Sequence, residues 1–353
     1  MPDAGKQLLD ELTGWAPQGG VVSVYVEIDP ADRSEGWRID LKNKLAGVDR
    51  AAAERVLARF PPDSPLPRGR TQVGFVELGG ARREIWRGFQ TASGATTAAQ
   101  GDLPRLEPLM RILDDGGPFG VVVVSIEAVR VLEWTLGEVV ELDGWELEVT
   151  SLDWHERKAP RRDPTAGTGV SASGRDQYAQ RLDHNREQFL KQAGRLVASR
   201  YGDRDWRQLL VIGEADRPKL LIRGLGAVVD RVHEVHHDLI RAAAPEIAAR
   251  VDEQLEGLNR AREQALIAQV ERAIGSRNGA ALGPEEVLET LAEGRAHHVI
   301  FDATREWERR DGVPISELMI QRALATDARV TPVEGSAAET LAERDGAVAL
   351  LRY

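Results

Sequence analysis

The C-terminal end of the chain alternates regularly between helix and strand patterns, and this alternation restricts the possible folds more than any other feature. Three amphipathic stretches are each followed by a short apolar run, in the order Pro284–Glu293, His297–Asp302, Ser316–Ala325, Arg329–Val333, Ala337–Glu343 and Val348–Arg352. Strands that alternate with helices bury both of their faces, so the pattern predicts an α/β/α sandwich.

The 353 residues are too many for one core, and the N-terminal part has a different pattern. A strand at Val21–Ile28 is followed by a helix at Trp37–Leu57. Two further strand patterns flank Gly79 and Gly80, a hairpin signal, and a loop is expected at 93–101. Together these patterns predict an α+β domain over residues 1–117.

A central domain over 118–245 is predicted from three apolar strand patterns in close succession, at Val121–Ile126, Val129–Leu136 and Glu138–Thr150. A stripe of apolar residues at helical spacing then runs from Ile240 to Ile274 and ends in a break at Gly275 to Gly283. This helix is expected to lead into the C-terminal domain, residues 246–353. The expected fold class is therefore α/β and α+β, with three domains.

Within the central domain, Glu156 to Asp176 is rich in glycine, proline, serine and threonine and has no apolar periodicity. It predicts a long loop, of a kind that is usually functional or disordered, followed by a helix at Gln177–Tyr201. Between Glu156 and Arg200, ten lysine and arginine residues stand against five acids, a net charge of +5. The whole chain carries −11, so the remainder carries −16. One basic segment in an acidic chain indicates either an RNA-binding site or a solvated helix face.

Several function classes have no support in the sequence. Cysteine is absent, which excludes disulfides and thiolate chemistry. No apolar run is long enough to cross a bilayer, the N-terminus has no signal-peptide pattern, and a cytoplasmic location is expected. The Walker A, GxSxG and HExxH motifs are missing, so no cofactor and no metal site is predicted.

Other groups of residues have a structural interpretation that we favour. His233, His236 and His237 form an HxxHH pattern on a predicted strand, where His236 faces away from the other two, so a metal site is not expected. The Lys42, Asn43 and Lys44 run is interpreted as a solvated helix face. Three tryptophans of the central domain are interpreted as packing residues, with stacking on RNA bases as the alternative: Trp134, Trp154 and Trp206.

Three stretches resemble one protein family in the same order. They are FGVVVVSIEAVRVLEWTLGEVVEL from Phe119, GRDQYAQRLDHNREQFLKQAGRLVASRY from Gly174, and EEVLETLAEGRAHHVIFD with the terminal DGAVALLRY. They are similar to the archaeal and eukaryotic class-I peptide chain release factors, and most similar to a bacterial subgroup resembling the Vms-like quality-control peptidyl-tRNA hydrolases. The resemblance implies a ribonuclease H-like central domain with a glycine-rich loop and a C-terminal domain of the kink-turn-binding ribosomal protein type.

The resemblance also implies a site in the loop, but the family's GGQ motif is absent. Gln177 is the nearest glutamine, with Gly174 three positions before it, while counting back from the helix without gaps places Ser173 at the glutamine position. These three residues are the candidate catalytic residues. The candidate RNA-binding residues are the basic side chains in and beside the loop: Arg157, Lys158, Arg161, Arg162, Arg175 and Arg181.

The leading hypothesis is a codon-independent, release-factor-like peptidyl-tRNA hydrolase that acts on stalled ribosomes. Water would attack the ester with the help of loop 160–177. The alternative is a noncatalytic ribosome- or RNA-binding factor on the same scaffold. A nuclease would need clustered carboxylates, for which Asp153 and Asp163 are the nearby candidates. The expected partners are the large ribosomal subunit and peptidyl-tRNA, and a protein could bind through the acidic surface.

Overall fold

The computed structural model describes residues 3–28, 36–61, 67, 69–80, 82–147, 170–204, 206–226, 231–275 and 279–352. The chain forms two compact units. Unit 1 combines Met1–Gly117 with Asp252–Tyr353, and unit 2 is Pro118–Val251. No helix among the described residues has the length and hydropathy needed to span a bilayer. The predicted mixed α/β, multidomain class is confirmed, while the three-domain division stays a prediction.

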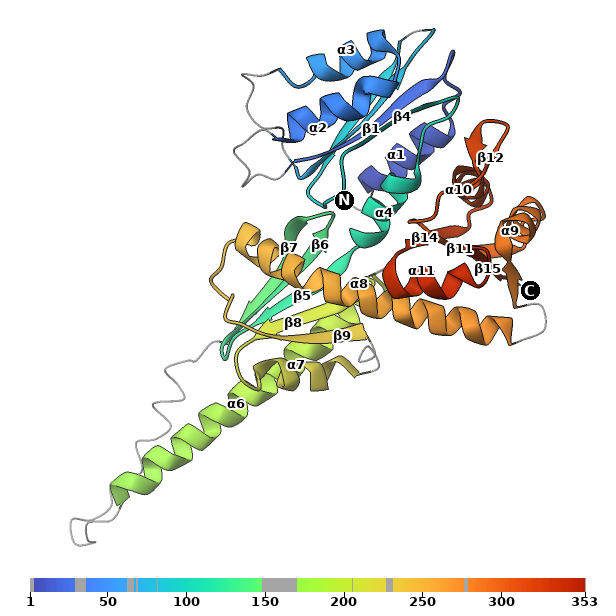
Figure 1. Cartoon of the computed structure of the whole chain (residues 1–353). Helices are drawn as coiled ribbons and strands as arrows, with labels where there is room; N and C mark the ends of the chain where they lie inside the picture. The colour runs from blue at the N-terminus through green and yellow to red at the C-terminus, as the bar shows by residue number, and fades with distance from the viewer. Residues whose placement is uncertain are drawn as a thin grey trace, which may run out of the picture. The chain divides into compact units, whose positions relative to one another are not determined.

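The N-terminal part of unit 1 is an antiparallel sheet in the order β3-β2-β1-β4. Its strands are β1 Val21–Glu27, β2 Thr71–Glu77, β3 Glu84–Phe89 and β4 Thr97–Gly101. The associated helices are α1 Asp3–Thr13, α2 Gly36–Lys44, η1 Leu45–Gly47, α3 Arg50–Ala58 and α4 Glu107–Asp115. Strand β1 is central and almost wholly buried, and α2 and α3 pack on it through Trp37, Leu41 and Val56 (Figure 1).

The C-terminal part of unit 1 contains a sheet in the order β10-β15-β11-β14, in which β11 and β14 are parallel. Its strands are β10 Ala280–Leu282, β11 Ala296–Asp302, β14 Arg329–Val333 and β15 Ala347–Leu351, and β12 Arg309–Arg310 pairs with β13 Val313–Pro314 in a separate hairpin. The helices are α9 Gly283–Ala292, α10 Ile315–Ala325 and α11 Gly335–Ala342, together with the part of α8 Ala244–Ile274 that follows Val251. The end of α8 packs with α11 on the sheet, and β11 is buried on both faces, as the alternating sequence predicts.

Unit 2 is built on a sheet in the order β7-β6-β5-β8-β9. Its strands are β5 Phe119–Val124, β6 Ala128–Thr135, β7 Glu138–Glu146, β8 Leu209–Gly213 and β9 Val232–His236. Strands β5, β8 and β9 are parallel, while β6 and β7 form the antiparallel meander that the sequence predicts. The helices α6 Val170–Tyr201 and α7 Arg217–Leu225 cover one face of this sheet (Figure 1).

Several predicted boundaries are wrong. The helix expected at Trp37–Leu57 is divided by η1, and Asp49 caps α3 by accepting a hydrogen bond from the amide of Ala52 at 2.9 Å. The loop expected at 93–101 contains β4, which pairs with β1. The break expected at Gly275 to Gly283 contains β10, which pairs with β15. These strands form through pairing with distant segments, which local patterns do not contain.

The loop expected to continue to Asp176 ends earlier, because α6 begins at Val170. A single glycine inside a helix, here Gly174, costs only about 1 kcal/mol relative to alanine. The neighbouring Ala172, Arg175 and Gln177 are compatible with helix, so the glycine does not stop it. The part of the predicted loop at 148–169 lies outside the described residues.

Candidate functional site

Helix α6 is the longest helix of unit 2, and only its C-terminal part is held in the core. Its 32 residues correspond to a length of about 48 Å. Leu190, Ala193 and Val197 are buried against the sheet, whereas the N-terminal half extends beyond it (Figure 1). At the end of the helix, Tyr201 stacks on Trp206 with ring centroids 5.4 Å apart. The sheet therefore fixes the direction of a helix whose other half is available to a partner.

The crossing between α6 and α7 depends on two glycines. A Cβ atom on Gly194 would lie 2.2 Å from the carbonyl oxygen of Leu221. A Cβ atom on Gly224 would lie 2.2 Å from the carbonyl oxygen of Lys191. Neither position has room for a Cβ atom, so the backbones of the two helices are in direct contact. Through this contact α7 helps to hold α6 in place.

Some basic side chains of α6 are engaged in ion pairs, and others are not. Arg186 pairs with Glu127 at 2.5 Å, Lys191 pairs with Glu187 at 2.6 Å, and Arg200 pairs with Asp143. Arg181 and Arg195 are exposed and make no ion pair within the described part of the chain. Cations without a protein partner can bind phosphate at no loss of an existing pair.

The predicted catalytic residues lie on the backbone of the first turns of α6. Ser173, Gly174 and Gln177 are all helical, and so is Arg175. Their side chains are outside the described part of the structure, so their assignment as catalytic stays a prediction. Of the predicted RNA-binding residues, Arg181 is exposed on α6. The others in the preceding segment lie outside the described residues: Arg157, Lys158, Arg161 and Arg162.

The three histidines of the HxxHH pattern have separate environments. Burial lowers the pKa of His233 below its ordinary value. His236 lies 3.3 Å from Glu234, and His237 lies 3.3 Å from Arg250. Among the described residues, no group of three or more histidine or acidic side chains is arranged to hold a metal ion. The predicted alternative, a nuclease centre using Asp153 and Asp163, falls outside the described residues.

Two of the three tryptophans considered as possible RNA-stacking groups are in the core. Trp134 is 1% exposed and Trp206 is 8% exposed, so both are packing residues, while Trp154 lies outside the described residues. The indole nitrogen of Trp206 donates a hydrogen bond to Glu133 at 2.8 Å. Lys42 and Lys44 lie on the exposed face of α2, as predicted.

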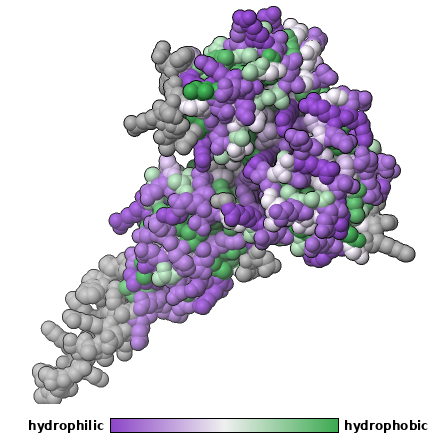
Figure 2. Space-filling model, in the orientation of Figure 1, coloured by the Kyte–Doolittle hydropathy of each residue, from purple (hydrophilic) through white to green (hydrophobic). Residues whose placement is uncertain are grey.

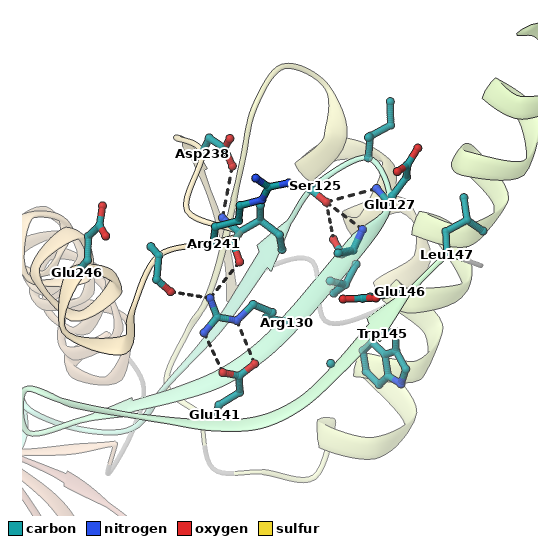
Figure 3. Close-up of a pocket in the computed structure, with 16 residues that line it drawn as sticks. Ser125, Glu127, Arg130, Glu141, Trp145, Glu146, Leu147, Asp238, Arg241 and Glu246 are labelled. Carbon is teal, nitrogen blue, oxygen red and sulfur yellow. Dashed lines mark hydrogen bonds and ion pairs between the residues drawn. The ribbon is translucent and has the colours of Figure 1, made fainter. Parts of the chain in front are cut away.

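A groove of about 1070 Å³ lies in unit 2 and was not predicted from the sequence (Figure 3). Three segments line it: the turn from Ser125 to Arg130, the end of β7, and the chain from Asp238 to Glu246. In the sequence, the only indication of this groove was the presence of two charged residues, Arg130 and Glu141, on predicted strands. The approach of the third segment is a long-range contact that no local pattern contains.

Arg130 holds two walls of the groove together. Its Nε and Nη2 atoms donate to the two carboxylate oxygens of Glu141 at 3.0 and 2.8 Å. Its Nη1 atom donates to the carbonyl oxygens of Ile240 and Ala242 at 3.1 and 2.8 Å. The hydrogen bonds from Arg130 hold the pKa of Glu141 below its ordinary value. A single guanidinium therefore joins β7 to the segment that leads into α8.

The central part of the chain is release-factor-like. Residues 104–256 match the family model described as bacterial archaeo-eukaryotic release factor family 10, and this range contains all of unit 2. The match confirms the predicted membership of the release-factor superfamily for this region. The closer relation to the Vms-like hydrolases stays a prediction. No curated protein matches the sequence.

Several solved structures are similar at low identity. Ribosome-bound archaeal Pelota, in a model with ABCE1, is 13% identical with a TM-score of 0.45, over 99% of this chain and 94% of that chain. S. cerevisiae Dom34, described as a translation termination-like factor involved in RNA quality control pathways, is 10% identical with a TM-score of 0.41, over 80% of each chain. Archaeoglobus fulgidus Pelota is 14% identical with a TM-score of 0.35, over 80% of this chain and 79% of that chain. These values are too low to transfer any property to this chain.

Proposed function

We propose that this protein acts on the large ribosomal subunit as a release-factor-like peptidyl-tRNA hydrolase that does not read a codon. The observation that carries the proposal is the family match over 104–256, which includes α6 and the basic segment before it. The exposed Arg181 and Arg195 support RNA as the partner of this helix. Such a factor would work in the cytosol, where ribosomes are found.

The proposal includes the finer fold assignments. It takes unit 2 as a ribonuclease H-like domain and the C-terminal sandwich as the kink-turn-binding ribosomal protein type. It also takes residues 160–177 as the segment that reaches the ester bond, with Arg157, Lys158, Arg161, Arg162 and Arg175 contacting RNA phosphates beside Arg181.

The chemistry requires a water molecule, a group that orients it, and donors for the negative charge that develops on the ester oxygen. The N–H groups at the start of a helix have no intrahelical acceptor, and in α6 these include residues 170–172. The N–H groups of Ser173 and Gln177 come later and are both used inside the helix. Gln177 can contribute only through its side chain.

The helical backbone at Gln177 also favours a second candidate, a noncatalytic ribosome- or RNA-binding factor. A helix cannot enter a narrow site as closely as a glycine-rich loop can. In this alternative, α6 and its basic side chains bind RNA, and no ester is hydrolysed.

The experiment uses purified large ribosomal subunits that carry a labelled peptidyl-tRNA. Release of the peptide is followed for the wild type, Gln177→Ala and Ser173→Ala, with Gln192→Ala, an exposed residue of the same helix, as the matched control. Release that is lost only in Gln177→Ala or Ser173→Ala supports the hydrolase and identifies its residue. Binding without release by any form supports the noncatalytic factor.

A further inference from the structure

The groove of unit 2 has an excess of negative charge. Five carboxylates and two guanidiniums line it, a net charge of −3: Glu127, Glu141, Glu146, Asp238 and Glu246 against Arg130 and Arg241. Glu127 is paired with Arg186 and Glu141 with Arg130. The other three carboxylates are exposed and form no ion pair with any described residue. Within the described part of the chain, these three carboxylates carry the unpaired negative charge of the groove.

The same groove exposes apolar surface between these carboxylates. Ile126 is 36% exposed, and it is one of four large apolar side chains of the described chain with this degree of exposure. Trp145, Leu147 and Ile240 also line the groove and are partly buried. Glu246 lies on one side of the groove, and Glu146 and Trp145 lie on the other (Figure 3). A ligand in the groove therefore meets both acidic and apolar groups.

These features exclude several classes of ligand. A net negative lining repels RNA, and no group of three metal-binding side chains occurs among the described residues. The volume of about 1070 Å³ is slightly larger than that of small-molecule sites, which span roughly 300–1,000 Å³. A cationic chain with apolar side chains matches the size, the charge and the surface of the groove.

We propose that this groove is the docking site for an extended segment of a partner protein that carries lysine or arginine together with apolar side chains. Glu146, Asp238 and Glu246 would pair with the cations, and Ile126 would contact the apolar side chains. The bonds from Arg130 hold the walls in place before binding, which reduces the ordering needed on association. The proposal goes beyond the ribosomal function and does not depend on it, since no residue of α6 lines the groove.

The test measures the fluorescence anisotropy of two short labelled peptides on the full chain. In one peptide lysine alternates with leucine and serine, and in the other glutamate replaces lysine. The groove variant combines Glu146→Gln, Asp238→Asn and Glu246→Gln. The control variant combines three exposed acids of unit 1: Glu289→Gln, Glu306→Gln and Glu339→Gln. Thermal unfolding of each variant establishes that it is folded.

The lysine peptide is expected to bind the wild type and the control variant equally, and to bind the groove variant roughly tenfold more weakly. Ile126→Ser is expected to weaken binding roughly threefold through the loss of apolar contact. A charge-reversed variant, Glu146→Lys with Glu246→Lys, should prefer the glutamate peptide. Equal binding of both peptides by the wild type would overturn the proposal. Equal losses in the groove and control variants would do the same, as would a labelled single-stranded RNA that displaces the peptide from the groove.

Discussion

Gly194 of α6 and Gly224 of α7 are in direct backbone contact, so close that a Cβ atom on Gly194 would lie 2.9 Å from the Cα of Gly224. This contact is one of the places where the rest of unit 2 holds the long helix. Its stability depends on the absence of two side chains, and it is therefore sensitive to the smallest substitution.

Gly194→Ala is expected to lower the free energy of unfolding of unit 2 by about 1–3 kcal/mol, because the methyl group forces the two helices apart. The measurement is urea unfolding followed by circular dichroism. Gly257→Ala is the matched control, since Gly257 lies within α8 with no atom within 4 Å of the position of its Cβ. There alanine should raise the stability by up to about 1 kcal/mol. A stability of Gly194→Ala equal to that of the wild type would show that the contact is not needed.

The indole of Trp206 depends on Glu133 for its hydrogen bond, and both residues are 8% exposed. Glu133→Ala leaves the buried N–H without an acceptor, which is expected to cost about 1–3 kcal/mol. Glu133→Gln retains an oxygen acceptor and should cost less. Chemical unfolding monitored by tryptophan fluorescence compares the two variants, and equal losses would contradict a role for the hydrogen bond.

Glu317 makes the stability of unit 1 depend on pH. Burial raises its pKa from 4.5 to about 7, although its carboxylate accepts hydrogen bonds from the amides of Leu106 and Glu107 at 2.8 and 3.0 Å. Between pH 4.5 and 7 the folded state keeps a proton that the unfolded state releases. The free energy of unfolding should therefore fall as the pH rises through this window, by up to about 3 kcal/mol from this residue.

Glu317→Gln cannot ionise, so its stability should vary less between pH 5 and pH 7 than that of the wild type. Urea midpoints at several pH values measure the difference. Glu339→Gln, at an exposed residue of the same unit, is the matched substitution and should keep the wild-type slope. Burial also raises the pKa of the neighbouring Glu107, so some decrease with pH should remain in both variants.

Arg181 and Arg195 should contribute to RNA binding by releasing counterions. Replacing both with glutamine is expected to reduce the slope of log affinity against log salt by about 1–2. Filter binding of ribosomal RNA over a range of salt concentrations measures the slope. Arg82 and Arg272, both exposed in unit 1, provide a control pair. An unchanged slope in the Arg181 and Arg195 variant would remove α6 from the RNA interface.

Much of the fold could be predicted from the sequence because its signals are local. Strand β5 is a run of apolar residues, and the alternation that ends in β15 follows from successive short patterns. The division of the first helix was missed, although Gly47 and the capping residue Asp49 both signal it. Strands β4 and β10 were missed for a different reason, since their partners are far away in the sequence.

The candidate site was predicted less completely. The basic character of α6 follows from its composition, but which arginines are already paired depends on distant acids such as Glu127 and Asp143. The groove depends on the approach of Ile240 and Ala242 to Arg130, more than 100 residues earlier in the chain, as their sequence separations of 110 and 112 residues show. No periodic pattern in the sequence predicts this long-range contact.

The hydrogen bonds from Leu106 and Glu107 to Glu317 join positions that are 211 and 210 residues apart. A ribosome adds roughly 5–20 residues per second, so the acceptor of these two amides is made about 10–40 s after the amides themselves. During that time the amides of Leu106 and Glu107 lack this acceptor, and the whole of unit 2 is synthesised. The N-terminal part of unit 1 therefore cannot complete its hydrogen bonds until α10 has been synthesised. In a chain truncated before Glu317, the amides of Leu106 and Glu107 at the start of α4 lack this acceptor.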